Sequence, residues 1–128
     1  MLNRRLCALA LVLTAAIHLA VVPEHLREWP LAAGFFVVLA VVEMALAVGV
    51  VRHPHRPTFI AGVLVSVASV ALWVVSRSVG LPAGPEAFVP EAALAPDVAS
   101  TTLELLSALL FFQLARRTTT PTLSPIHQ

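Results

Sequence analysis

Four long apolar stretches, separated by short polar segments, dominate the pattern of this 128-residue chain. Each stretch is close to the roughly 20 residues that a helix needs to cross the hydrocarbon core of a bilayer. Prolines bracket the first two polar segments, where a missing backbone N–H does least harm. The pattern predicts an all-α fold, a four-helix transmembrane bundle, with spans at residues 6–22, 31–51, 59–76 and 98–115.

The predicted spans make up one membrane domain, residues 1–115, followed by a short polar tail. The longest connection lies between the third and fourth spans. Residues 116–128 are rich in Thr, contain two prolines and lack helical periodicity, which is typical of a disordered end. We therefore expect a disordered cytoplasmic tail.

Composition supports the bilayer as the main surroundings of the chain. Hydrophobic residues make up 59% of the sequence and charged residues 12%, whereas soluble domains carry roughly 25% charged residues. No basic stripe indicates nucleic-acid binding. Glycine fingerprints for nucleotides and zinc-protease motifs are also missing. Cys7 is the only cysteine, so an internal disulfide is excluded.

Arginine placement predicts the orientation, because short cytoplasmic segments are enriched in positive residues. Arg27 and Arg77 fall on one side of the predicted bundle, and six arginines fall on the other: Arg4, Arg5, Arg52, Arg56, Arg116 and Arg117. We expect a plasma-membrane protein with both termini in the cytoplasm. An alternative interpretation is an N-terminal secretory signal, with cleavage after Ala16 or Ala20.

Three ionisable residues interrupt the predicted spans, and such residues usually face the bundle interior. At about 1.5 Å per residue, His18 lies roughly 6 Å and Glu104 roughly 9 Å from the outer surface, in one layer with Arg77. Glu43 lies roughly 18 Å deep. We therefore expect Glu43 to form a second, separate buried polar site, or to be isolated and protonated.

Structural roles compete with functional ones for these residues. His18 could bond a neighbouring carbonyl. Thr101 and Glu104 match the capping-box pattern at a helix start, although a start there leaves a short span, so we favour Asp97 as the N-cap. In the third span Gly62, Ser66, Ser69, Trp73 and Ser76 form a stripe, which favours helix packing over a substrate path.

Arg77 precedes a turn stiffened by Gly80, Pro82, Gly84 and Pro85. A guanidinium held in place can bind carboxylates through two parallel hydrogen bonds. We expect Glu104, Glu24 and Glu28 as its candidate partners, in a structural clamp at the outer mouth. Anchoring of an anionic ligand is the alternative.

The constellation "HLAVVPEHLREWPLAAGFF", "WVVSRSVGLP" and a late glutamate resembles a group of small four-span membrane proteins of actinobacterial type. That pattern has an early His, a PEHxxE turn and an SRxxGLP motif. The matching positions are His18, Glu24, His25, Glu28, Gly34, Phe35, Ser76, Arg77, Gly80, Leu81, Pro82 and Glu104. The resemblance implies the four-span architecture and no particular activity.

The predicted outer cluster consists of His18, Arg77, Glu104, Glu24, His25 and Glu28. We expect it to bind a small ligand, or a divalent metal (Zn or Cu) through His18 and His25, or to dock a partner in a larger membrane complex or homo-oligomer. Haem is not expected, because only His18 lies inside a span. The alternative function is a small membrane enzyme that uses His18 and Glu104 in acid–base chemistry on a lipid-soluble substrate.

Overall fold

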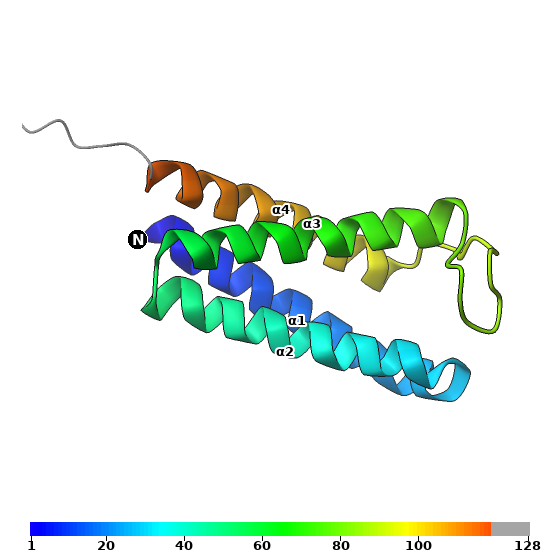
Figure 1. The fold of residues 1–128 in the computed structure, drawn as a ribbon. Coiled ribbons are helices and arrows are strands. Elements are labelled where there is room, and N and C mark those ends of the chain that lie inside the picture. Colours follow the sequence, from blue (N-terminus) through cyan, green and yellow to red (C-terminus); the bar gives the residue numbers. More distant parts are fainter. Residues whose placement is uncertain (119–128) are drawn as a thin grey trace, which may run out of the picture.

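The computed structural model describes residues 1–118, which form four α-helices and no strand (Figure 1). The helices are α1 (Leu2–Glu28), α2 (Pro30–Arg52), α3 (Arg56–Ser78) and α4 (Ala95–Arg117). All four are long and apolar enough to cross a membrane. The predicted all-helical, four-span fold is therefore confirmed. The predicted tail beyond residue 118 lies outside the described residues.

Helix α1 runs through Pro23 and ends at Glu28, six residues beyond the predicted end of the first span, so the PEHxxE residues are helical and not a turn. Only Trp29 separates α1 from α2. Pro23 lies near the end of the helix, where a lost backbone hydrogen bond disturbs little of the helix that follows. At Pro30 the missing N–H costs nothing, because the first residue of a helix has no intrahelical acceptor.

The helices form two antiparallel pairs, α1–α2 and α3–α4, joined mainly by contact between α1 and α4. Within the described part of the chain the order around the bundle is α2, α1, α4, α3. Of the four neighbouring helix pairs, α2 and α3 make the least contact, and Figure 1 shows the two antiparallel pairs diverging away from the N-terminus. The seam between α2 and α3 is therefore the open side of the bundle.

The end of the bundle that contains the N-terminus is packed with apolar side chains. The buried cluster consists of Cys7, Leu11, Ala47, Val50, Phe59, Leu110 and Phe111. Helices α3 and α4 approach closely here, because a Cβ added at Gly62 would lie 2.3 Å from Cε2 of Phe111. Part of the predicted small-residue stripe thus does serve helix packing.

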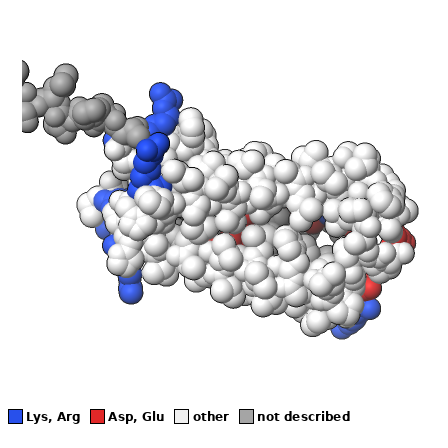
Figure 2. Space-filling model, viewed as in Figure 1, with Lys and Arg blue, Asp and Glu red and all other residues white. Residues whose placement is uncertain are grey.

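Segment 79–94 folds back over the end of α3. Gly80 adopts φ 77°, a conformation that favours glycine, and the Glu91 backbone N–H donates to the Ser76 carbonyl at 3.0 Å. In Figure 2, basic side chains gather at the end with the N-terminus, while acidic ones lie at the other end and in a hollow between the helix pairs.

Candidate functional site: a cavity between the two helix pairs

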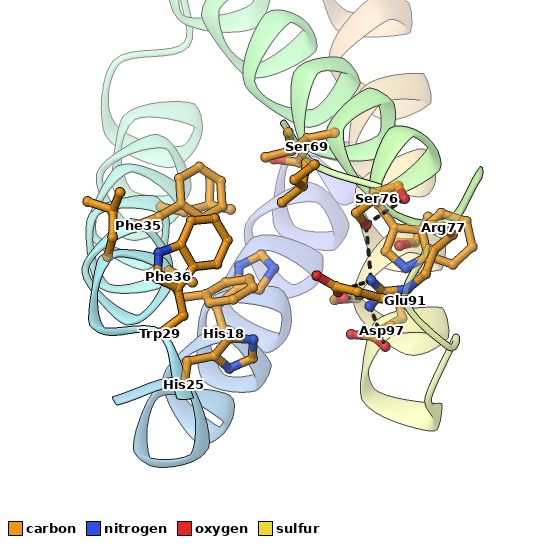
Figure 3. A pocket seen from close by; sticks show the side chains of 18 of the residues that line it. His18, His25, Trp29, Phe35, Phe36, Ser69, Ser76, Arg77, Glu91 and Asp97 are labelled. Carbon is orange, nitrogen blue, oxygen red and sulfur yellow. Dashed lines mark hydrogen bonds and ion pairs between the residues drawn. The ribbon is translucent and has the colours of Figure 1, made fainter. Parts of the chain in front are cut away.

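A cavity of about 760 Å³ occupies the half of the bundle away from the N-terminus. Side chains of all four helices and of the 79–94 segment line it. In Figure 3, Phe35 and Phe36 of α2 lie across the cavity from Ser69 and Ser76 of α3. The cavity therefore lies along the weakly packed α2–α3 seam.

Aromatic rings form much of the cavity wall. Trp29 and Trp73, the only tryptophans in the chain, both line it. The Phe36 ring bridges two histidines of α1, with its centroid 5.4 Å from that of His18 and 4.7 Å from that of His25. The continuous helix through Pro23 places both imidazoles on the cavity side.

His18 forms a hydrogen bond with Glu43 deep in the bundle. The His18 Nδ1 and Glu43 Oε2 atoms are 3.1 Å apart, and the residues are 6% and 0% exposed. The expectation that Glu43 forms a separate site is therefore wrong. His18 lines the cavity, whereas Glu43 lies behind it.

The length of α1 explains why His18 and Glu43 meet. Because the helix ends at Glu28 rather than Val22, His18 lies roughly 15 Å from its outer end, and Glu43 lies roughly 20 Å into α2. Helical side chains lean toward the N-terminus of their own helix. In two antiparallel helices the His18 and Glu43 side chains therefore lean toward each other.

Glu104 joins this pair from α4. It is 2% exposed, lines the cavity and lies near Glu43, His18 and Ser66. Within the described residues, neither of its carboxyl oxygens has a hydrogen-bond partner. The buried hydroxyls of Ser66 and Ser107 are also unpartnered in this part of the chain. The layer thus contains more polar atoms than the protein itself satisfies, which is unusual for buried groups.

Arg77 forms a clamp at the outer end of the cavity, but with partners other than those predicted. Its guanidinium binds Glu91 through NH1 and Asp97 through NH2, the latter at 2.8 Å (Figure 3). NH1 also donates to Ser76 Oγ at 3.0 Å. The Glu91–Ser76 backbone bond brings Glu91 to the arginine. The clamp therefore joins α3, the loop and the first turn of α4.

Asp97 is not the N-cap of α4, which is Leu94. The Leu94 backbone N–H donates to Asp97 Oδ2 at 2.9 Å, so the aspartate ties back the first turn. The capping-box alternative at Thr101 is wrong, because the helix already begins at Ala95.

The structure brings together some members of the predicted cluster and leaves others outside. His18, His25, Arg77 and Glu104 all line the cavity. Glu24 and Glu28 are exposed on the last turns of α1 and do not line it. They also do not bind Arg77, whose acidic partners are Glu91 and Asp97.

Metal binding by His18 and His25 stays a prediction. Among residues 1–118 no group of three or more His, Cys, Asp or Glu side chains could hold a metal ion. His18 Nδ1 is paired with Glu43, and His25 Nδ1 lies 2.9 Å from the carbonyl oxygen of Val21, the helical turn before it. The two nitrogens are thus engaged within the protein.

Sequence reasoning missed several residues of the site. Phe36, Glu91 and the serines flanking Glu104 were not singled out as site residues. A signal did exist for Ser107, which lies three residues after Glu104 and so shares its helix face. Glu91 had no such signal, because its place depends on how the loop folds back.

The chain matches no protein-family model, no curated protein and no solved structure.

Proposed function

We propose that this membrane protein binds a small amphipathic molecule in the cavity between its two helix pairs. The observation that carries the proposal is the cavity itself, about 760 Å³ in volume with a mainly apolar wall and a few polar groups. Ligand sites in proteins usually have volumes of about 300–1,000 Å³ and this kind of lining. Helix packing alone would not leave such a space, because protein interiors are otherwise close-packed.

Unpartnered donors at the outer end suggest where a ligand's acceptor group would lie. Trp73 Nε1 and Arg77 Nε are buried without a hydrogen-bond partner in the described chain, and both residues line the cavity. A neutral oxygen acceptor on the ligand would satisfy them. The apolar body would then rest against Phe35, Phe36 and Trp29.

The proposal includes a direction of entry. The apolar cluster around Leu11 and Phe111 closes the arginine-rich end, so entry is from the opposite end or through the α2–α3 seam. We place that opposite end outside the cell, with both termini in the cytoplasm of a plasma-membrane protein, on the strength of the arginine distribution. Association with a larger complex or a second copy stays a prediction.

Native mass spectrometry of the purified protein tests the proposal. We expect a small molecule to co-purify with the wild-type chain and to be lost in Ser69→Leu, which adds a branched side chain at the cavity wall. Ala68→Leu is the matched control, because Ala68 is the exposed neighbour on α3 and does not line the cavity. Equal amounts in all three proteins would contradict the proposal.

Acid–base catalysis on the bound molecule is a second candidate, and the His18–Glu43 pair favours it. A carboxylate that orients one imidazole nitrogen is a common element of acid–base sites. In that case the molecule bound by His18→Gln would be the unconverted substrate, with a mass different from that of the molecule bound by the wild type. The same mass in both would count against catalysis.

A further inference from the structure

We infer that the bound molecule carries a positive charge, such as an alkylammonium group, and that Glu104 supplies its counter-charge. The inference rests on the proposed ligand site and adds the chemical class of the ligand. It is carried by the buried carboxyl group of Glu104 in the cavity wall, which has no hydrogen-bond donor among residues 1–118.

The charges around the cavity are unequal. Among the described residues, one arginine, Arg77, lines it together with three carboxyl groups, those of Glu91, Asp97 and Glu104. Arg77 already binds Glu91 and Asp97, so its single positive charge is more than offset within the clamp. This balance argues against the alternative that Arg77 anchors an anionic ligand.

The third carboxyl group, that of Glu104, lines the cavity and is not part of the clamp. Glu104 is 2% exposed, and His18, which acts on it electrostatically, is already hydrogen-bonded to Glu43. An ionised group without partners is costly in apolar surroundings. A cation in the cavity lowers that cost, and apolar walls screen the attraction weakly.

The remaining groups around the cavity suit a cationic ligand. Electron-rich ring faces attract ammonium and guanidinium groups, and Trp29, Phe35, Phe36 and Trp73 line the space. The other basic side chains facing the cavity are His18 and His25, each with Nδ1 engaged by the protein. Glu43 adds a second carboxyl group directly behind the cavity wall.

Energy transfer from tryptophan offers a direct readout, because both tryptophans line the cavity. Three dansyl amides with the same five-carbon chain, ending in an amine, an alcohol or a carboxylate, serve as probes for the protein in lipid nanodiscs. In Ser69→Leu, the variant designed to block the cavity, energy transfer comes only from probe dissolved in the lipid. This background is subtracted from the signal of the other proteins. Saturation curves then give a Kd for each probe.

We expect saturable binding of the amine and the alcohol, with the amine bound about tenfold more tightly or better, and weak binding of the carboxylate. In Glu104→Gln the amine should lose this advantage while the alcohol keeps its affinity. Glu86→Gln is the matched control, since Glu86 is exposed in the loop and does not line the cavity. It should behave as wild type.

The outcomes separate the two proposals. Saturable binding with equal affinity for all three probes would support the ligand site and overturn the inferred charge. Preference for the carboxylate would also overturn it. Absence of saturable binding for every probe would count against the ligand site itself. The comparison of amine with alcohol in the wild type decides the charge even if Glu104→Gln fails to fold.

Discussion

The hydrogen bond between His18 and Glu43 joins two ionisable side chains inside the bundle, at 3.1 Å and with almost no exposure. Removing two such groups from water is costly, and the bond between them offsets the cost only while both partners are present. We expect the pair to contribute more to which helices meet, and in which register, than to net stability.

Paired substitutions test this role at the residue scale. We expect His18→Leu and Glu43→Leu each to lower the free energy of unfolding by about 1–3 kcal/mol, because each leaves the other polar group buried without its hydrogen-bond partner. The double variant should be no less stable than either single variant. Thermal unfolding in detergent gives the comparison, and additive losses would contradict a direct pair.

The sequence allowed prediction of which residues would be buried, but only part of how they pair. His18, Glu43 and Glu104 stand out because charged side chains are rare in apolar spans. Their depths depended on where α1 ends, and a proline in the sequence suggested an end that the helix does not have. Six extra helical residues moved His18 inward and brought it to Glu43.

At the scale of elements, α3 and α4 approach closely at Gly62, where the Phe111 ring occupies the place of a side chain. A small residue allows close approach of two membrane helices. The spacing of small residues along α3 predicted this contact. The same stripe also contributes Ser69 and Trp73 to the cavity wall, which spacing alone could not show.

Gly62→Ala should destabilise the α3–α4 pair by about 1–3 kcal/mol, because the added methyl group overlaps the Phe111 ring. The expected result is a lower Tm of the purified protein. Gly34→Ala is the control, since its added Cβ meets no heavy atom within 4 Å and should leave the Tm unchanged or slightly raised. Part of the loss should return in Gly62→Ala/Phe111→Leu.

The Arg77 clamp should protect the loop between α3 and α4 from proteolysis. Phe88 is 68% exposed in this loop and offers a chymotrypsin site. We expect Arg77→Gln to speed cleavage after Phe88 severalfold, because Glu91 and Asp97 then lose their shared cation. The control is Arg27→Gln, a change at the end of α1, which should be cleaved at the wild-type rate. Equal cleavage rates for the two variants would contradict the clamp.

At the scale of the whole molecule, apolar length and proline positions were enough to predict four helices. They could not predict the order of the helices around the bundle or the weak α2–α3 seam, which depend on side-chain fit between distant segments. The cavity follows from that order. Its lining was therefore only partly foreseeable, through the ionisable residues.

Cysteine labelling tests the orientation of the molecule. In a Cys7→Ser background, we expect a membrane-impermeant maleimide added to intact cells to label Ala87→Cys, in the α3–α4 loop, and not His53→Cys, between α2 and α3. The reason is the arginine excess at the end that carries His53. Inside-out vesicles should reverse the result, and labelling of His53→Cys in intact cells would overturn the orientation.

The apolar packing around Leu11 and Phe111 makes the cavity a blind chamber. The two routes, the outer end and the α2–α3 seam, both reach the half of the bundle away from the N-terminus, so a molecule enters and leaves on the same side of the membrane. With the proposed orientation, the protein responds to what the outer leaflet holds and is insensitive to the same compound confined to the inner one.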